Sequence, residues 1–160
     1  MSTTDIYNYQ KVDDAVATSG QPTIAQLKSA AVEGVVTIIN LGFLGQRYSL
    51  KDEAGIVSSL GMSYYHIPVD WDNPTEENFI NFEKLINRLP GGKMLIHCAA
   101  NYRATAFYAL YASRNLDWSE TRVETLMSPV WQGSHYPVWD DFIRRIKSQT
   151  SPSNGPGSKD

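Results

Sequence analysis

Two short apolar segments without polar alternation constrain the fold of this chain more than any other feature of its sequence. Residues 36–41 (VTIINL) and 94–97 (MLIH) are rich in aliphatic and β-branched side chains, which is typical of strands buried on both faces of a sheet. Helical spacing of apolar residues precedes each segment, over 23–33 and 74–89. Because strands that alternate with helices pair in parallel, the sequence predicts an α/β fold with a central, mostly parallel sheet flanked by helices on both faces.

The remaining elements follow from the same periodicities. We expect one further strand over 63–69 and helices near 50–60, 104–115, 119–127 and 136–148. In the last helix, Val138, Phe142 and Ile146 are expected to face the core. A chain of 160 residues matches one domain, which we assign to residues 1–148. The polar, Gly- and Pro-containing segment 149–160 is predicted to be a flexible C-terminal tail.

Composition argues against several classes of partner. The net charge of −3 and the isoelectric point near 5.6 give no basic field for nucleic acid. No apolar run reaches the roughly 18 residues that a membrane span needs, and the first residues do not resemble an export signal. One cysteine and three scattered histidines predict neither an internal disulfide nor a metal site.

Residues 94–105, MLIHCAANYRAT, carry the clearest chemical signal. A predicted buried strand leads into a cysteine, an arginine follows five positions later, and a helix begins. Between such a strand and helix, backbone N–H groups converge on one point and the helix dipole adds positive potential. A planar guanidinium can also hold two oxygens of a tetrahedral anion. We therefore predict an anion-binding loop, called the anion loop below, with these members: His97, Cys98, Ala99, Ala100, Asn101, Tyr102 and Arg103, followed by Thr105.

The same positive potential favours the thiolate form of a cysteine, which makes Cys98 the candidate nucleophile. Attack on a phosphoryl group would give a phosphocysteine intermediate, while Arg103 and the loop amides stabilise the charge of the transition state. His97 is expected to orient the loop through hydrogen bonds to the backbone rather than to accept the thiol proton.

Residues 97–103 resemble the signature loop of cysteine-dependent protein tyrosine and dual-specificity phosphatases. Residues 19–41, SGQPTIAQLKSAAVEGVVTIINL, resemble the bacterial branch of that superfamily whose domain is also found fused to a metallo-β-lactamase-like hydrolase. Together the two segments span most of residues 15–148. The resemblance implies a phosphatase-like fold, a bacterial protein, hydrolysis of a phosphomonoester, and no metal or organic cofactor.

Two features of the anion loop depart from these families. The branch typically has glycine where this chain has Asn101, a residue type that tolerates left-handed backbone and can preserve the loop. Better-known tyrosine phosphatases have five residues between cysteine and arginine, whereas Cys98 and Arg103 enclose four. Rhodanese sulfurtransferases resemble this shorter spacing and hold a persulfide on the cysteine.

Phosphatases of this type place an aspartic acid on a loop upstream of the cysteine, where it protonates the leaving oxygen. Asp70 and Asp72, in VDWDNPTEEN, lie 28 and 26 residues before Cys98, and we favour Asp70 because it lies at the predicted end of the strand. By the same resemblance, Thr105 is expected to correspond to the hydroxyl residue that often follows the arginine and assists thiolate departure, although Ala104 intervenes here.

The sequence therefore predicts a phosphatase that takes a phosphorylated substrate, of the phosphotyrosine type or a small molecule, with phosphate or sulfate as simple ligands of the anion loop. Two alternatives remain: a rhodanese-like sulfurtransferase or persulfide carrier, and an inactive module that binds phosphate or another anion. We expect a soluble protein of the bacterial cytoplasm, or of the periplasm if an export signal has been removed. No oligomeric state is predicted.

Overall fold

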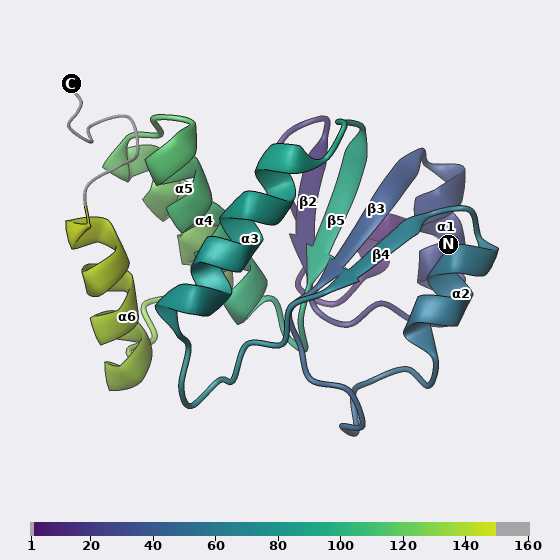
Figure 1. Cartoon of the computed structure of the whole chain (residues 1–160), viewed down its shortest axis with the longest axis horizontal. Coiled ribbons are helices and arrows are strands. Elements are labelled where there is room, and N and C mark those ends of the chain that lie inside the picture. Colours follow the sequence, from purple (N-terminus) through teal and green to yellow (C-terminus); the bar gives the residue numbers. More distant parts are fainter. Residues whose placement is uncertain (1, 150–160) are drawn as a thin grey trace.

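Five strands form one sheet in the computed structural model, which describes residues 2–149 (Figure 1). The strands are β1 (Gln10–Lys11), β2 (Val16–Ser19), β3 (Val35–Asn40), β4 (Ser63–His66) and β5 (Lys93–His97). The helices are a short 3-10 helix (Thr3–Asp5), α1 (Ile24–Val32), α2 (Glu53–Ser59), α3 (Glu76–Arg88), α4 (Tyr102–Asn115), α5 (Glu120–Trp131) and α6 (Pro137–Ser148). The predicted tail, 149–160, lies outside the described residues except for Gln149, which caps α6.

The strand order is β1-β2-β5-β3-β4, so β5 is the central strand. β2, β5, β3 and β4 run parallel, and only β1 at the edge is antiparallel. The predicted mostly parallel sheet is therefore confirmed. β1 and β2 were not predicted, because β1 has two residues and β2 reads VATS, which is too short and too polar to give a periodic signal.

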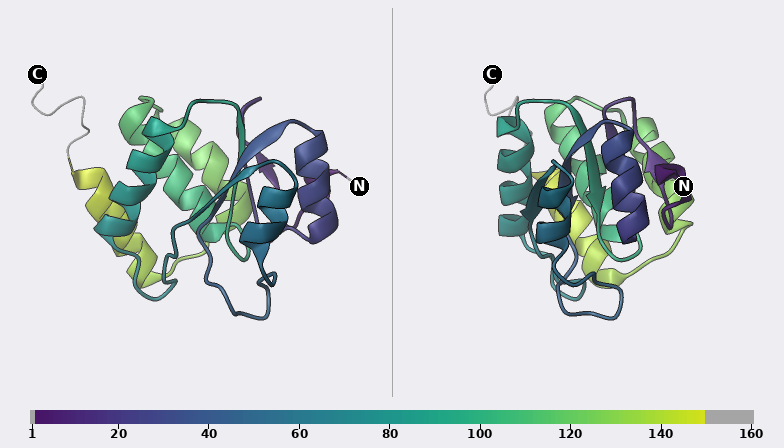
Figure 2. Two further views of the ribbon diagram at one scale, coloured as in Figure 1. Left: turned by 45° about the vertical axis from the view of Figure 1, so that its right-hand side comes forward. Right: turned by 90° about the vertical axis from the view of Figure 1, so that its right-hand side faces the viewer.

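Helices cover both faces of the sheet, as predicted. Figure 1 shows α1 and α2 on one side of the strands and α3 to α6 on the other, and the turned views of Figure 2 separate the same two layers. Neighbouring residues of a strand enter different cores: Ile38 and Leu95 pack toward α1 and α2, while Ile39 and Ile96 pack toward α3 to α6. Burial on both faces explains why β3 and β5 are apolar without alternation.

The helix boundaries follow their capping residues. Thr23 before α1 and Thr75 before α3 each form a reciprocal capping box with the residue three positions later. In α6 the expectation for Val138 is wrong, since its side chain is 47% exposed while Trp139 is fully buried. The inward stripe runs through Trp139, Phe142 and Ile146, which lie three and four positions apart, and Val138 falls beside it.

The loops that follow β3, β4 and β5 meet at one edge of the sheet, the lower edge in Figure 1. In parallel sheets, ligands bind at the carboxyl ends of the strands, and this edge is where the anion loop leaves β5. Within residues 2–149, every helix is too short or too polar to span a lipid bilayer.

Candidate active site

Cys98 lies directly after β5, at the carboxyl end of the central strand, and is 1% exposed. Its N–H donates to the carbonyl of Ser19 at 3.3 Å, and the N–H of Gln21 donates to the carbonyl of Ala99 at 3.0 Å. Gly20 and Ala100 form an isolated antiparallel bridge. The first half of the anion loop is therefore fixed to the end of β2 by main-chain contacts.

Asn101 is in the left-handed region, with φ 76° and ψ −5°, at the N-cap position of α4. This agrees with the prediction that asparagine can replace glycine here. Its buried side chain donates from Nδ2 to the carbonyl of Asn8 at 2.7 Å, while its Oδ1 accepts from the hydroxyl of Thr105 at 2.9 Å. Asn8 in turn donates from Nδ2 to the carbonyl of Ala100 at 3.0 Å.

Thr105 lies behind the anion loop and is fully buried. Its hydroxyl donates to Asn101 and is 3.4 Å from the hydroxyl of Thr18 on β2. In this arrangement Thr105 supports the shape of the anion loop from the side of β2.

Arg103, in the first turn of α4, is 8% exposed and donates from Nη1 to the carbonyl of Val69 at 2.8 Å. Val69 is the residue before Asp70, so the arginine links the anion loop to the segment that carries the two candidate acids. The guanidinium has five N–H donors, which leaves donors for an anion beside the one that binds Val69.

His97 is fully buried and has an acceptor at each ring nitrogen. Nδ1 is 3.1 Å from the carbonyl of Cys98, as the prediction of a backbone contact requires, and Nε2 is 2.6 Å from Oε2 of Glu53. Both partner atoms are oxygens, so the two contacts hold the imidazole in one orientation at the start of the anion loop.

Glu53, in the first turn of α2, is a site residue that sequence reasoning missed. Burial alone would raise the pKa of Glu53, but the hydrogen bond and charge of His97, with a hydrogen bond from Gln21, hold that pKa below its ordinary value. Gln21 donates from Nε2 to Oε1 of Glu53 at 2.8 Å. A single glutamate early in a helix resembles an ordinary capping residue. The sequence offers only an indirect indication of Glu53, because a buried histidine such as His97 needs a hydrogen-bond partner.

A cavity of about 290 Å³ lies against the anion loop. The anion loop contributes Cys98, Ala99, Ala100, Tyr102 and Arg103, and Trp71 and Tyr136 complete the lining, so that three of the lining side chains are aromatic: Trp71, Tyr102 and Tyr136. We call these three residues the aromatic wall. Trp71 is central to it, because its ring centroid lies 6.0 Å from that of Tyr102 and 5.1 Å from that of Tyr136.

The loop of residues 70–75, called the acid loop below, is held by bonds to its main chain. The indole N–H of Trp139 donates to the carbonyl of Trp71 at 2.8 Å. Oδ1 of Asp70 accepts from the N–H of Asp72 at 2.9 Å. Both aspartates are exposed, and neither lines the cavity. Asp70 lies between two bound carbonyls, those of Val69 and Trp71, whereas Asp72 lies beyond them.

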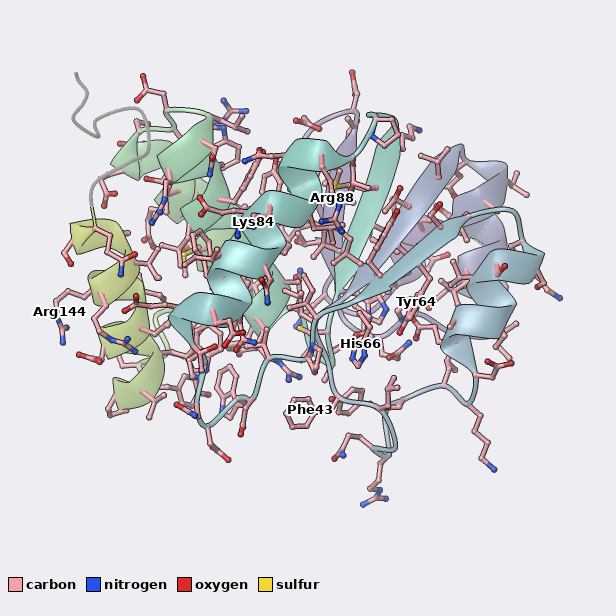
Figure 3. All side chains as sticks on the ribbon, in the orientation of Figure 1. Phe43, Tyr64, His66, Lys84, Arg88 and Arg144 are labelled. Atoms are coloured by element: carbon pink, nitrogen blue, oxygen red, sulfur yellow. The ribbon has the colours of Figure 1, made fainter. Side chains whose placement is uncertain are left out.

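The opposite side of the same sheet edge is formed by the loop after β3. Figure 3 shows Phe43 and His66 near this lower edge, while Lys84 and Arg88 lie higher along α3. His66 contacts the carbonyl of Gly42 through Nε2 at 2.6 Å, which fits the structural role that its place in the strand favours. Among the described residues that line the cavity, Arg103 is the only cation.

No family model matches the sequence, and no curated protein matches it significantly. Among solved structures, a DUF442 protein of Shewanella putrefaciens CN-32, provisionally described as a phosphatase, is 30% identical with a TM-score of 0.85. The match covers 92% of this chain and 96% of that one. The chain belongs to the DUF442 family.

More distant structures share the fold of this DUF442 protein. Tk-PTP in its active form is 17% identical with a TM-score of 0.70, over 89% of this chain and 97% of its own. The core catalytic domain of the PP-IP phosphatase SIW14 from S. cerevisiae is 15% identical with a TM-score of 0.70, over 89% and 90%. The predicted phosphatase-like fold is therefore confirmed.

Proposed function

We propose that this DUF442 protein is a cysteine-dependent phosphatase that hydrolyses a phosphomonoester through a phosphocysteine intermediate. The observation that carries the proposal is the cavity in which Cys98 and Arg103 share one wall, at the end of the central strand and the start of α4. The phosphatase descriptions of structural neighbours support the same reaction class.

In the first step the Cys98 thiolate attacks phosphorus, and an S–P bond forms as the bond to the leaving oxygen breaks. The amides of the anion loop and Arg103 stabilise the charge on the phosphoryl oxygens. The His97 ring, held by Glu53, fixes the main chain at Cys98 from behind. In the second step water attacks phosphorus, the S–P bond breaks, and phosphate leaves with the thiolate restored.

Asp70 is our candidate for the general acid that gives its proton to the leaving oxygen and later takes a proton from water. Two contacts support Asp70 over Asp72. Arg103 binds the carbonyl immediately before Asp70, and Trp139 binds the carbonyl immediately after it. The Asp70 side chain could then turn toward the cavity while the main chain on both sides of it stays hydrogen-bonded.

The cavity suits a substrate with one phosphoryl group on a flat or apolar body, such as a phosphotyrosine-type or small phosphorylated molecule. The aromatic wall can stack on such a body. Arg103 as the lining cation balances a single phosphoryl group rather than a series of phosphates.

Steady-state turnover of an aryl phosphate, measured beside sulfur transfer from thiosulfate to cyanide, tests the proposal. We expect phosphate release by the wild type, and a loss of about 10⁴-fold or more in Cys98→Ser, because the nucleophile is removed. Thiocyanate formation that depends on Cys98, without phosphate release, would instead support a sulfurtransferase. Binding of phosphate with neither activity would support an anion-binding module.

A further inference from the structure

The N-terminal arm, residues 2–9, contacts the anion loop through two asparagine side chains. Each side chain donates a hydrogen bond to a main-chain carbonyl of the other segment. Asn101 donates to the main-chain carbonyl of Asn8 at 2.7 Å, and Asn8 donates to the main-chain carbonyl of Ala100 at 3.0 Å. Both asparagines have left-handed backbone, with φ 76° at Asn101 and φ 52° at Asn8. We call this pair of hydrogen bonds the amide clamp.

The backbone around the amide clamp is closely packed. The N–H of Gly20 donates to the carbonyl of Tyr7 at 2.8 Å. A Cβ at Gly20 would lie 2.7 Å from the carbonyl oxygen of Ala99 and 2.9 Å from Cδ2 of Tyr7. Arm, β2 and anion loop therefore meet backbone to backbone at this point, and only glycine fits between them.

Asn101 occupies the one place in the anion loop where the backbone must turn to the left-handed region before α4 begins. Glycine can adopt this conformation at lower cost, but it also allows many others. The side chain of Asn101 instead joins three segments: the arm through Asn8, the anion loop itself, and α4 through Thr105. Compared with glycine, Asn101 therefore restricts the conformations of the anion loop and fixes its shape.

We propose that Asn8 and Asn101 are positioning residues that hold the anion loop in the shape that binds a tetrahedral oxyanion, so that the N-terminal arm is part of the active site's support. The role of the anion loop as a phosphate site rests on the proposed function, whereas the amide clamp rests on the hydrogen bonds alone. Neither residue lines the cavity, and each acts on the ligand through the amides of residues 98–101.

The test uses the single cysteine of the sequence. Cys98 is therefore the only thiol that iodoacetamide can alkylate, and inorganic phosphate bound in the anion loop should slow that alkylation. The concentration of phosphate that halves the alkylation rate therefore reports on the loop without any need for turnover.

Asn101→Gly keeps the left-handed backbone and removes the side chain of the clamp. Asn8→Gly does the same for the other side. Asp117→Gly, at φ 59° in the turn after α4, is the matched control for glycine at a left-handed position.

We expect the half-protecting phosphate concentration to rise about tenfold in Asn101→Gly and Asn8→Gly, because each loses hydrogen bonds that fix the loop. The double variant should lose little more than either single variant, because the two amides form one clamp. Asp117→Gly should match the wild type. Where an aryl phosphate is turned over, KM should rise more than kcat falls.

Wild-type protection in both clamp variants, with only a lower melting temperature, would overturn the proposal, since the asparagines would then serve folding alone. Absence of phosphate protection in the wild type would overturn it as well. Protection by phosphate that weakens in the clamp variants, in a protein without phosphatase activity, would support the clamp and count against the proposed function.

Discussion

The two sides of the anion loop are built in opposite ways. Its back, toward β2, the arm and α2, consists of fully or almost fully buried polar side chains in two hydrogen-bonded pairs, His97 with Glu53 and Asn101 with Thr105. In front of it lies the aromatic wall, with the acid loop held by indole and guanidinium donors. Under the proposed function, the back sets the shape of the anion site, while the front contacts the body of the substrate and carries the candidate acid.

The largest expected effect separates the two aspartates at the front. Asp70→Asn should lower kcat for an aryl phosphate by about 10²–10⁴-fold, because the proton donor to the leaving oxygen is lost. Asp72→Asn is the matched control and should change kcat little. The measurement is steady-state turnover with leaving groups of differing basicity, since loss of the acid should matter most for the most basic one. Equal effects of the two variants, or a larger one in Asp72→Asn, would contradict the assignment.

At the back, Gly20→Ala tests whether close packing fixes the anion loop. The added methyl would meet the carbonyl of Ala99 and the ring of Tyr7 at under 3.0 Å. Overpacking of this kind costs about 1–3 kcal/mol, and the strain here falls on the loop backbone. We expect a lower melting temperature together with weaker protection of Cys98 by phosphate. A variant with wild-type phosphate protection would show that the loop tolerates displacement.

Glu53→Gln replaces the carboxylate that binds Nε2 of His97 with a neutral amide of similar shape. We expect kcat/KM to fall by about tenfold, since one charge-assisted hydrogen bond to His97 is weakened.

The stability of the wild type should also depend on pH in a defined direction. The pKa of Glu53 is held below its ordinary value of 4.5, so the stabilisation is present above that pH and is lost as pH falls through the lowered pKa.

Urea denaturation at neutral pH and at successively lower pH measures this dependence. The wild type should lose stability below about pH 4.5 more steeply than Glu53→Gln, because the variant has no carboxylate to protonate. Parallel curves for the two proteins would show that the Glu53–His97 pair does not link folding to pH.

The smallest effect concerns the indole that holds the acid loop. Trp139→Phe removes the hydrogen bond to the carbonyl of Trp71 and should cost about 1–3 kcal/mol of stability, with a fall in kcat of a few-fold. Trp131→Phe is the comparison variant, since that indole donates to the carbonyl of Tyr102 in the anion loop rather than to the acid loop. Chemical denaturation and turnover together distinguish them: similar losses of stability are expected, with a fall in kcat in Trp139→Phe and a rise in KM in Trp131→Phe.

The same division explains what sequence could predict. β3, β5 and the start of α4 follow from apolar runs and helical spacing, and with them the place of Cys98 and Arg103. Local chemistry also predicted that Asn101 can take a glycine position. Each of these signals lies within a few consecutive residues.

Long-range partners could not be predicted. Glu53 lies 44 positions from His97, and Asn8 lies 93 from Asn101, so no local pattern joins them. Tyr136 and Trp139 reach the cavity and the acid loop only because α6 packs against α4. The polar back and the aromatic front both form only when distant segments pack together, so the sequence did not predict them. The anion loop between them lies within residues 97–103 and could be predicted.

The most direct test of the central claim is to trap the phosphorylated intermediate. The Asp70→Asn variant is mixed with an aryl phosphate whose phosphorus is labelled, the reaction is stopped rapidly by denaturation, and the labelled peptide is identified by mass spectrometry. We predict label on Cys98 through a phosphorus–sulfur bond, and none in Asp70→Asn combined with Cys98→Ser. Phosphate release without label on Cys98 at any time in the approach to steady state would contradict the account.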